Sequence, residues 1–429
     1  MTGRKVPNIS HWLVIFSLVF AGEMIFSLPF HVARFFRPTL LNSFHLSNSN
    51  FGDILSVYGI MAMIAYFPGG IIADKFPPGK LMATSLFLTA IGGIYMTQIP
   101  GNIGLSILYG YWGLTTILLF WAAMIRATRE WGGKHNQGSA FGILDGGRGL
   151  IAALVATLAV IVLSRSFPEN VNSLSDADRI VALKTVIWLY VTMTFLAGIF
   201  VWFFIPEHKQ KIKSSSSNTL NGMKEVIRNR NVWLQAIIVV SAYCGYKGLD
   251  YYSLFAVDVL GMNELESADF MSTTAYLRPI SAVAAGFIVD RLTAKKVITV
   301  SFLLLAVGYA VLSIFEPSAN ITNIIFTNIV ITFIAVYALR GVYFALIQET
   351  KIPTHLTGTA VGLISLIGYT PDVFFNSIAG RILDANPGFT GYQNYFIMLA
   401  SISIFGLLAT LGLVTKKPKH IINNTTFRK

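Results

Sequence analysis

Twelve long apolar runs divide the sequence, and they restrict its fold more than any other feature. Each run is about 20 residues long, the length of a helix that crosses the hydrocarbon core of a bilayer. Such spans must satisfy their backbone hydrogen bonds internally, so they form helices that pack against one another. The sequence therefore predicts an all-α membrane protein with twelve transmembrane helices. The runs lie near residues 11–36, 52–73, 81–99, 103–125, 139–163, 186–205, 232–256, 270–289, 297–315, 322–347, 358–382 and 393–414.

The composition supports a membrane location and excludes several other classes. Hydrophobic residues make up 54% of the chain and charged residues only 12%, whereas soluble domains carry roughly a quarter charged residues. The mean hydropathy is +0.63. The net charge of +12 comes from short loops rather than from one soluble face, so we expect no nucleic acid partner. Cys244 is the only cysteine, which excludes a disulfide framework and a multi-cysteine metal site.

A polar stretch separates the first six runs from the last six. It extends from Glu207 to Arg230 and holds several basic residues and four consecutive serines, Ser214 to Ser217. This composition is typical of a flexible linker followed by a basic amphipathic segment. We predict an N-terminal six-helix bundle over residues 1–206, a cytoplasmic linker over 207–230 and a C-terminal six-helix bundle over 231–429.

The basic residues of alternate loops predict the orientation of the chain. Arg4, Lys5, the linker and Lys416 lie on one side, and acidic residues dominate most of the opposite loops. Cytoplasmic loops carry an excess of lysine and arginine. We therefore expect a multi-pass protein of the cytoplasmic (inner) membrane, with both termini and the linker in the cytoplasm.

Two copies of one short motif lie about half the chain length apart. The first is Gly70-Ile-Ile-Ala-Asp74-Lys75 and the second is Gly286-Phe-Ile-Val-Asp290-Arg291. Glycine allows two helices to approach closely, aspartate at a helix end can bond a neighbouring helix, and a basic residue can hold a tight cytoplasmic turn. A second repeat begins at Gly138 and Gly358. We predict a duplication of six spans, with a cytoplasmic gate formed by Gly70, Asp74, Lys75, Gly286, Asp290 and Arg291.

The paired motifs resemble the signature loops of the major facilitator superfamily, and the resemblance covers nearly the whole chain. The departures are the added Pro77-Pro78 in the first copy and Ala294 where a glycine is usual in the second. The resemblance implies two bundles that rock around a substrate site near the middle of the bilayer. We accordingly expect a secondary active transporter that is a monomer in the lipid bilayer, with a small-molecule substrate and no cofactor.

Several charged residues lie at membrane depth, where each costs at least roughly 2.5 to 3.5 kcal/mol unless it faces a cavity or a partner. All of them lie in spans that the resemblance places in or beside the central cavity. We predict a substrate site that draws on the residues Arg340, Arg278, Lys247, Arg148, Tyr246 and Tyr337. The candidates for proton coupling are Glu23, as the leading carrier, and Asp250, Asp145 and Asp372.

Each of these residues also has a structural interpretation. Asp145 with Arg148 and Lys247 with Asp250 are spaced three residues apart, so each pair can neutralise itself on one helix face. Asp372 follows Pro371, which loosens the helix and leaves backbone groups to satisfy. Burial would favour the protonated form of Glu23, which suits a proton carrier. The competing arrangement is a permanent ion pair of Glu23 with an arginine across the cavity.

Three further stretches are more specific and resemble bacterial facilitator transporters that are distantly related to organophosphate and organic-anion carriers. They are Phe120 to Trp131, Gly142 to Leu150 and Gly368 to Asp372. In the organophosphate carriers a basic residue in span 1 and another in span 7 hold the phosphate. Lys247 lies near the second position, but Phe30 occupies the first and Arg34 lies one turn away.

These observations predict transport of a small polar organic anion coupled to protons, with anion exchange that needs no proton carrier as an alternative mechanism. The alternative functions are export of amphipathic or cationic compounds, attracted by Glu23 and Asp250, and a non-transporting membrane sensor with the same fold. The sequence has no phosphate-binding glycine loop, no metal-ligand cluster and no catalytic nucleophile motif, so we do not expect an enzyme or ATP-driven transport.

Overall fold

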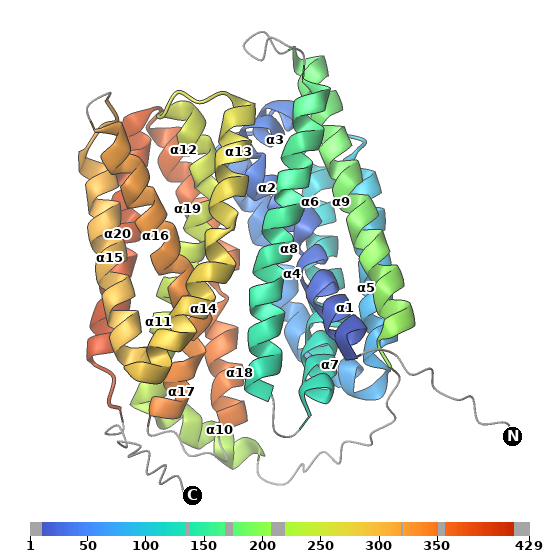
Figure 1. Ribbon diagram of the computed structural model, residues 1–429, viewed down its shortest axis with the longest axis vertical. Helices are drawn as coiled ribbons and strands as arrows, with labels where there is room; N and C mark the ends of the chain where they lie inside the picture. Colours follow the sequence, from blue (N-terminus) through green and yellow to red (C-terminus); the bar gives the residue numbers. More distant parts are fainter. Residues whose placement is uncertain are drawn as a thin grey trace, which may run out of the picture.

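The computed structural model describes residues 11–133, 137–167, 175–206, 219–318, 321–350 and 357–415, and helices make up nearly all of them. The one β contact in this part of the chain is an isolated bridge between Thr350 and Thr415. The prediction of an all-α fold is confirmed (Figure 1).

The first half of the chain contains the helices of the predicted spans 1 to 6. Their bounds are α1 His11–Met24, η1 Ser27–His31, α2 Val32–Phe35, α3 Arg37–Phe44, α4 Asn48–Lys75, α5 Pro78–Met96, α6 Asn102–Leu114, η2 Thr115–Trp121, α7 Ala122–Gly132, α8 Gln137–Ser166 and α9 Asp176–Phe204.

The second half repeats this pattern after a short helix, α10 Thr219–Arg228. The bounds of the following elements are α11 Arg230–Gly248, η4 Leu249–Tyr251, α12 Tyr252–Asp258, α13 Glu264–Ala275, α14 Leu277–Arg291, α15 Ala294–Ile314, α16 Thr322–Val342, η5 Tyr343–Ala345, α17 Leu346–Glu349, α18 Thr357–Gly368, α19 Pro371–Ala385 and α20 Phe389–Leu411.

The number of membrane spans is consistent with twelve. Ten helical segments of the described chain are long and apolar enough to cross a bilayer, and the bent pair at the start of the chain makes eleven. The helices α13 and α14 cover the remaining predicted span, number 8, and meet end to end at Tyr276. The predicted linker begins at residue 207, outside the described residues, so the domain boundaries stay a prediction.

Spans 1, 4, 7 and 10 are interrupted partway along their length. Span 1 bends by 41° beside the π-helical turn η1, and span 4 contains the π-helical turn η2. Spans 7 and 10 contain the 3₁₀ turns η4 and η5. Such turns are frequent at functional sites because they reorient side chains and free backbone groups. The charged residues predicted for the site lie close to these interruptions.

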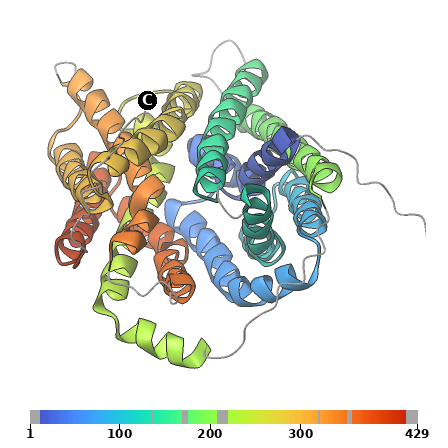
Figure 2. The same ribbon diagram turned by 60° about the horizontal axis from the view of Figure 1, so that its bottom comes forward.

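The two halves of the chain pack side by side (Figures 1 and 2). We call the end that holds α10, the start of α1 and the end of α20 the linker end, and the opposite end, which holds α3 and the start of α4, the distal end. Several contacts join the halves: α8 packs against α13 and α14, α4 packs along α19, and α2 and α3 pack against η4, α12 and α13. The central residues of these helices therefore surround the space between the halves.

Candidate functional site

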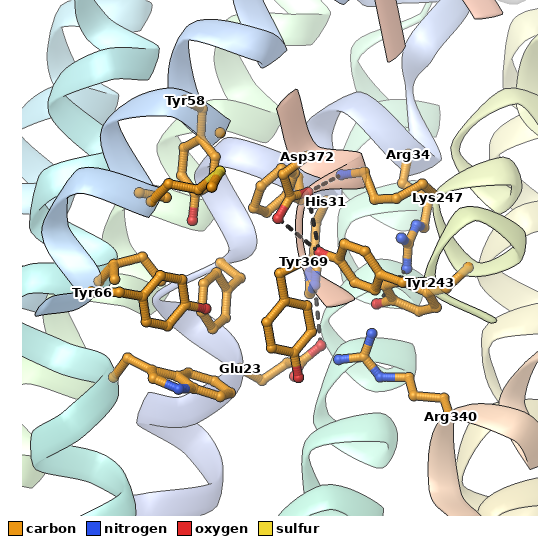
Figure 3. A pocket seen from close by; sticks show the side chains of 18 of the residues that line it. Glu23, His31, Arg34, Tyr58, Tyr66, Tyr243, Lys247, Arg340, Tyr369 and Asp372 are labelled. Carbon is orange, nitrogen blue, oxygen red and sulfur yellow. Dashed lines mark hydrogen bonds and ion pairs between the residues drawn. The ribbon is translucent and has the colours of Figure 1, made fainter. Parts of the chain in front are cut away.

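A cavity of about 90 Å³ lies between the two halves at the middle of the helices (Figure 3). One water needs roughly 10 to 15 Å³ by this measure, so the space suits a small molecule. Its lining comes from spans 1, 2, 4, 5, 7, 10 and 11. The lining residues include the charged groups Glu23, Arg34, Arg148, Lys247, Arg340 and Asp372.

Glu23 of α1 forms the centre of one charge cluster. Its carboxylate is 2% exposed and accepts bonds from Arg278 Nη1 at 2.7 Å and from Arg148 Nε at 3.1 Å. His31 Nε2 lies 3.2 Å from the Glu23 Oε1 atom. Asp145 lies farther out, with its Oδ1 atom 4.0 Å from Arg148 Nη1 and 3.9 Å from Arg278 Nη2. The structure thus contains the ion pair that competes with a free, proton-carrying Glu23.

Lys247 of α11 forms the centre of a second cluster. Its Nζ lies 3.3 Å from Asp372 Oδ1 and 3.5 Å from Asp250 Oδ2. Asp372 also accepts bonds from the Tyr243 hydroxyl at 3.1 and 3.0 Å. Arg34 Nε donates to Asp250 Oδ1 at 2.5 Å. The predicted Lys247–Asp250 pair is therefore present, and it is part of a larger network that joins the two halves.

Arg340 of α16 is the exception among these cations. In the described part of the chain no carboxylate oxygen pairs with its guanidinium. The guanidinium carbon instead lies 3.9 Å from the ring centroid of Tyr246 and points into the cavity (Figure 3). Tyr246 carries Arg34 over its ring as well, at 4.3 Å, and accepts a 2.9 Å hydrogen bond from Arg34 Nη1. Arg340 is thus held in place by an aromatic ring while its N–H groups remain available.

Aromatic side chains form much of the remaining lining. The first half of the chain contributes five of them and the second half three tyrosines with hydroxyl groups. The Tyr66 and Tyr369 rings face each other from opposite halves, 6.5 Å apart and nearly parallel. These residues are Phe26, Phe30, Tyr58, Tyr66 and Trp121 from the first half and Tyr243, Tyr246 and Tyr369 from the second.

Four of the predicted site residues do not line this central cavity. Arg278 pairs with Glu23, and Asp250 pairs with Arg34 and Lys247, so both contact residues that line the cavity. Tyr337 is 3% exposed, and its ring packs against that of Phe333. Asp145 lines a second cavity, described next.

The second cavity, of about 780 Å³, lies toward the linker end between α7, α8, α14 and α16. It shares Trp121, Arg148, Arg340 and Tyr369 with the central cavity, so the two are continuous. At the distal end the halves are joined instead. Glu264 of α13 accepts bonds from Thr39 at 2.6 Å and from Arg179 at 2.8 Å, both in the first half. The central site is therefore reached from the linker end and closed at the distal end.

The predicted gate residues lie at or near the ends of α4 and α14, and the side chain of Asp290 is outside the described part of the structure. Gly286 lines the second cavity, and Asp74 is exposed at the end of α4. We expected the motif glycines to let helices approach closely, but a Cβ at Gly70 or Gly286 would meet nothing within 4 Å. The physical reason is that the linker end is open in this conformation, so no second helix lies against them. Their role as a gate stays a prediction that concerns another conformation.

Sequence reasoning missed several residues that the fold brings to the interface between the halves. Arg37 is fully buried between the halves, and Glu264 and Asp384 bond across them at the distal end. Arg37 is the residue directly after the first apolar run, so the hydropathy of the sequence did not predict that it is buried. Glu264 and Asp384 lie in polar segments that are indistinguishable from ordinary loop residues. Only proximity in space reveals their partners.

Comparison with known proteins agrees with this geometry. A family model described as Major Facilitator Superfamily matches residues 13–376. Inner membrane protein YihN of Escherichia coli (strain K12) is 28% identical over 416 residues, which is 94% of this chain and 96% of YihN. Inner membrane protein YqcE of the same strain is 27% identical over 396 residues, 90% and 91% of the two chains.

A solved structure shows the same fold. The crystal structure of the nucleoside transporter NupG superposes with a TM-score of 0.69 at 13% sequence identity and covers 94% of this chain and 99% of NupG. At that identity the match shows the fold alone. The family model matches most of the sequence, and the structure has two repeated halves around a central charged cavity. The chain is therefore a multi-pass membrane transporter that belongs to the Major Facilitator Superfamily.

Proposed function

We propose that this protein is a secondary active transporter that moves a small organic anion across the inner membrane by alternating access, with its linker end in the cytoplasm. The observation that carries the proposal is Arg340, a cation at membrane depth that faces the cavity and has no carboxylate partner among the described residues. A guanidinium presents a planar set of N–H donors that matches a carboxylate or a related oxyanion. An uncompensated charge at this depth is costly, so it is typical of a functional site.

The charge balance of the centre supports the same class of substrate. Among the described residues, the two clusters and Arg340 contain five basic side chains and four carboxylates. A bound monovalent anion would make the site neutral. A cationic substrate would add to the excess of positive charge, which disfavours the alternative of a cation exporter.

The aromatic lining favours an anion that carries an apolar or ring-shaped part. Phe26, Phe30, Tyr66 and Trp121 contribute apolar ring surface from the first half of the chain. Figure 3 shows Tyr66 on the side of the cavity opposite Arg340. Ligand pockets commonly combine such walls with a few polar groups that fix orientation. A fully hydrated inorganic ion would use only the polar part of this lining.

A thermal-shift screen with purified protein tests the substrate class. Organic anions such as benzoate should stabilise the protein, by about 2.7 kcal/mol when the ligand is present at one hundred times its Kd. The stabilisation should disappear in Arg340→Gln and persist in Arg381→Gln, an exposed arginine at the distal end. Stabilisation by lipophilic cations alone would contradict the proposal and support the exporter. Absence of any transport in counterflow with a broad metabolite panel would support the sensor.

We further propose that transport is coupled to protons through Glu23. Arg148 lines the cavity and also bonds Glu23. An anion that binds Arg148 would compete with the Glu23 carboxylate, and a buried carboxylate that loses a cationic partner takes up a proton more readily. Anion and proton would then favour each other's binding, as symport requires. Asp145, Asp250 and Asp372 are the alternative carriers, and each lies within 4.0 Å of a basic group.

Proteoliposomes that contain Glu23→Gln test this coupling. We expect substrate-driven proton movement to be lost while anion exchange remains, because Gln keeps the shape but cannot carry a proton. Asp53→Asn is the control, since it neutralises an exposed carboxylate that pairs with Arg381 and is not a candidate carrier. Unchanged proton movement in Glu23→Gln would remove Glu23 from the mechanism and leave it as a structural partner of Arg278.

A further inference from the structure

Arg37, at the start of α3, is buried in a way that the substrate site does not explain. Its side chain is 0% exposed, and none of its three guanidinium nitrogens makes a hydrogen bond of normal geometry within the described residues. The guanidinium carbon lies 3.9 Å from the ring centroid of Tyr251 and 5.2 Å from that of Phe51. A buried charge is normally paired and hydrogen-bonded. The two aromatic rings therefore hold the Arg37 side chain in place, but they do not satisfy its N–H hydrogen-bond donors.

The two rings belong to different halves of the protein. Phe51 lies on α4 in the first half, as does Arg37 on α3, while Tyr251 lies on η4 in the second half. The Tyr251 hydroxyl donates to the backbone oxygen of Asn376 on α19 at 3.0 Å. A Cβ at Gly52 of α4 would overlap that same oxygen. Arg37 thus lies directly behind the contact between α4 and α19, which we call the distal seam.

Opening of the distal seam would change the surroundings of Arg37. The second half carries Tyr251 and α19 away from the first half, while Phe51 and Arg37 stay together. The guanidinium then loses one of its two stacking partners and is exposed to the distal solution with all of its donors free. A ligand that bonds these donors binds only the open state, so it shifts the population toward that state.

We propose that Arg37 is an anion-binding residue of the distal-open conformation, which receives a carboxylate or similar small oxyanion from the distal side before the anion reaches Arg340. This inference rests on the proposed anion transport. In this proposal, Arg37 is the first residue to bind an anion that enters from the distal side, and it is buried in the present conformation. The neighbouring Arg34 does not serve this purpose here, because Asp250 and Tyr246 already occupy its guanidinium.

A cysteine reporter in the distal seam tests the proposal on the full-length protein. Cys244, the only cysteine, is buried and is replaced by Ser. Ser56 of α4 is replaced by Cys, because its hydroxyl lies 2.9 Å from that of Ser377 on α19 and is partly covered while the seam is closed. Sodium acetate and sodium benzoate should raise the rate of maleimide labelling several-fold over sodium chloride at equal ionic strength. Arg37→Gln should abolish this increase, and Arg37→Lys should keep part of it.

One further variant separates this inference from the proposed function. In Arg340→Gln the anion-dependent labelling should persist, since Arg37 acts before the central site. If the increase is lost in Arg340→Gln but kept in Arg37→Gln, the inference about Arg37 is wrong and the proposed function stands. If neither anion changes the labelling of the parent protein, the inference is wrong whatever the thermal-shift screen shows. The melting temperature of each variant, measured in chloride, excludes loss of folding as the cause.

Discussion

The distal seam and the linker end place glycine in opposite environments. In the seam, a Cβ at Gly59 would overlap the backbone oxygen of Asp372, and one at Gly380 would overlap that of Asn48. At the linker end, a Cβ at Gly70 or Gly286 would meet no atom within 4 Å. The seam glycines are therefore required by the contact that exists in this conformation.

This difference bears on the proposed role of the duplicated motif. Gly70 and Gly286 cannot be explained by the present packing, although they are the centre of the sequence repeat. A transporter that alternates between two states needs a close helix contact at each end in turn. We infer that the motif glycines permit at the linker end the kind of contact that Gly59 and Gly380 permit at the distal end.

The largest effect should come from Gly59→Ala. The added Cβ meets backbone rather than a flexible side chain, so α4 and α19 cannot keep their present distance. The seam should stay open, and labelling of the Ser56→Cys reporter in the Cys244→Ser background should be fast with or without anions. Gly70→Ala, on the same helix, is the matched control and should not raise the labelling rate. Equal rates in both variants would mean that the two ends do not differ as described.

A smaller effect is expected from Asp74→Asn. If Asp74 bonds a neighbouring helix end when the linker end closes, its loss removes a charge-assisted hydrogen bond worth about 1.5 to 3 kcal/mol from the distal-open state. The population should then shift toward the present conformation, and the Ser56→Cys reporter should label at least about tenfold more slowly. Asp269→Asn, which changes another exposed carboxylate, serves as the control. Unchanged labelling in Asp74→Asn would contradict a gating role for the motif aspartate.

The smallest effect should come from Asp53→Asn in the distal seam. Asp53 pairs with Arg381 through bonds of 2.8 and 3.0 Å, but both side chains are more than half exposed. Solvent and salt screen such a pair, so labelling of the reporter should change by about twofold or less. The difference should vanish at high salt. A change as large as that of Gly59→Ala would show that charge, rather than close backbone packing, holds the seam closed.

The parts of the fold that depend on local sequence could be predicted. The apolar runs are helices in the structure, and the helical pattern of the first half is repeated in the second, as the duplicated motif predicts. The helix break predicted near Pro371 is the end of α18. The short pair Lys247–Asp250 could also be predicted, because two residues three apart share a helix face. The pairing of Glu23 with Arg278 could be stated only as an alternative to a free, proton-carrying Glu23. The two residues lie in different halves of the chain, and the sequence does not show how the halves dock.

The sequence by itself determined the class of the protein and the set of charged residues that must be sheltered from lipid, because hydrophobicity and charge are local properties that determine the cost of exposure to the bilayer. Only the tertiary structure decided which of these charges neutralise one another. Helix rotation and the docking of the two halves bring Glu23 to Arg278 and, among the described residues, leave Arg340 and Arg37 without carboxylate partners. Those two arginines are the basis for the proposed path of the anion.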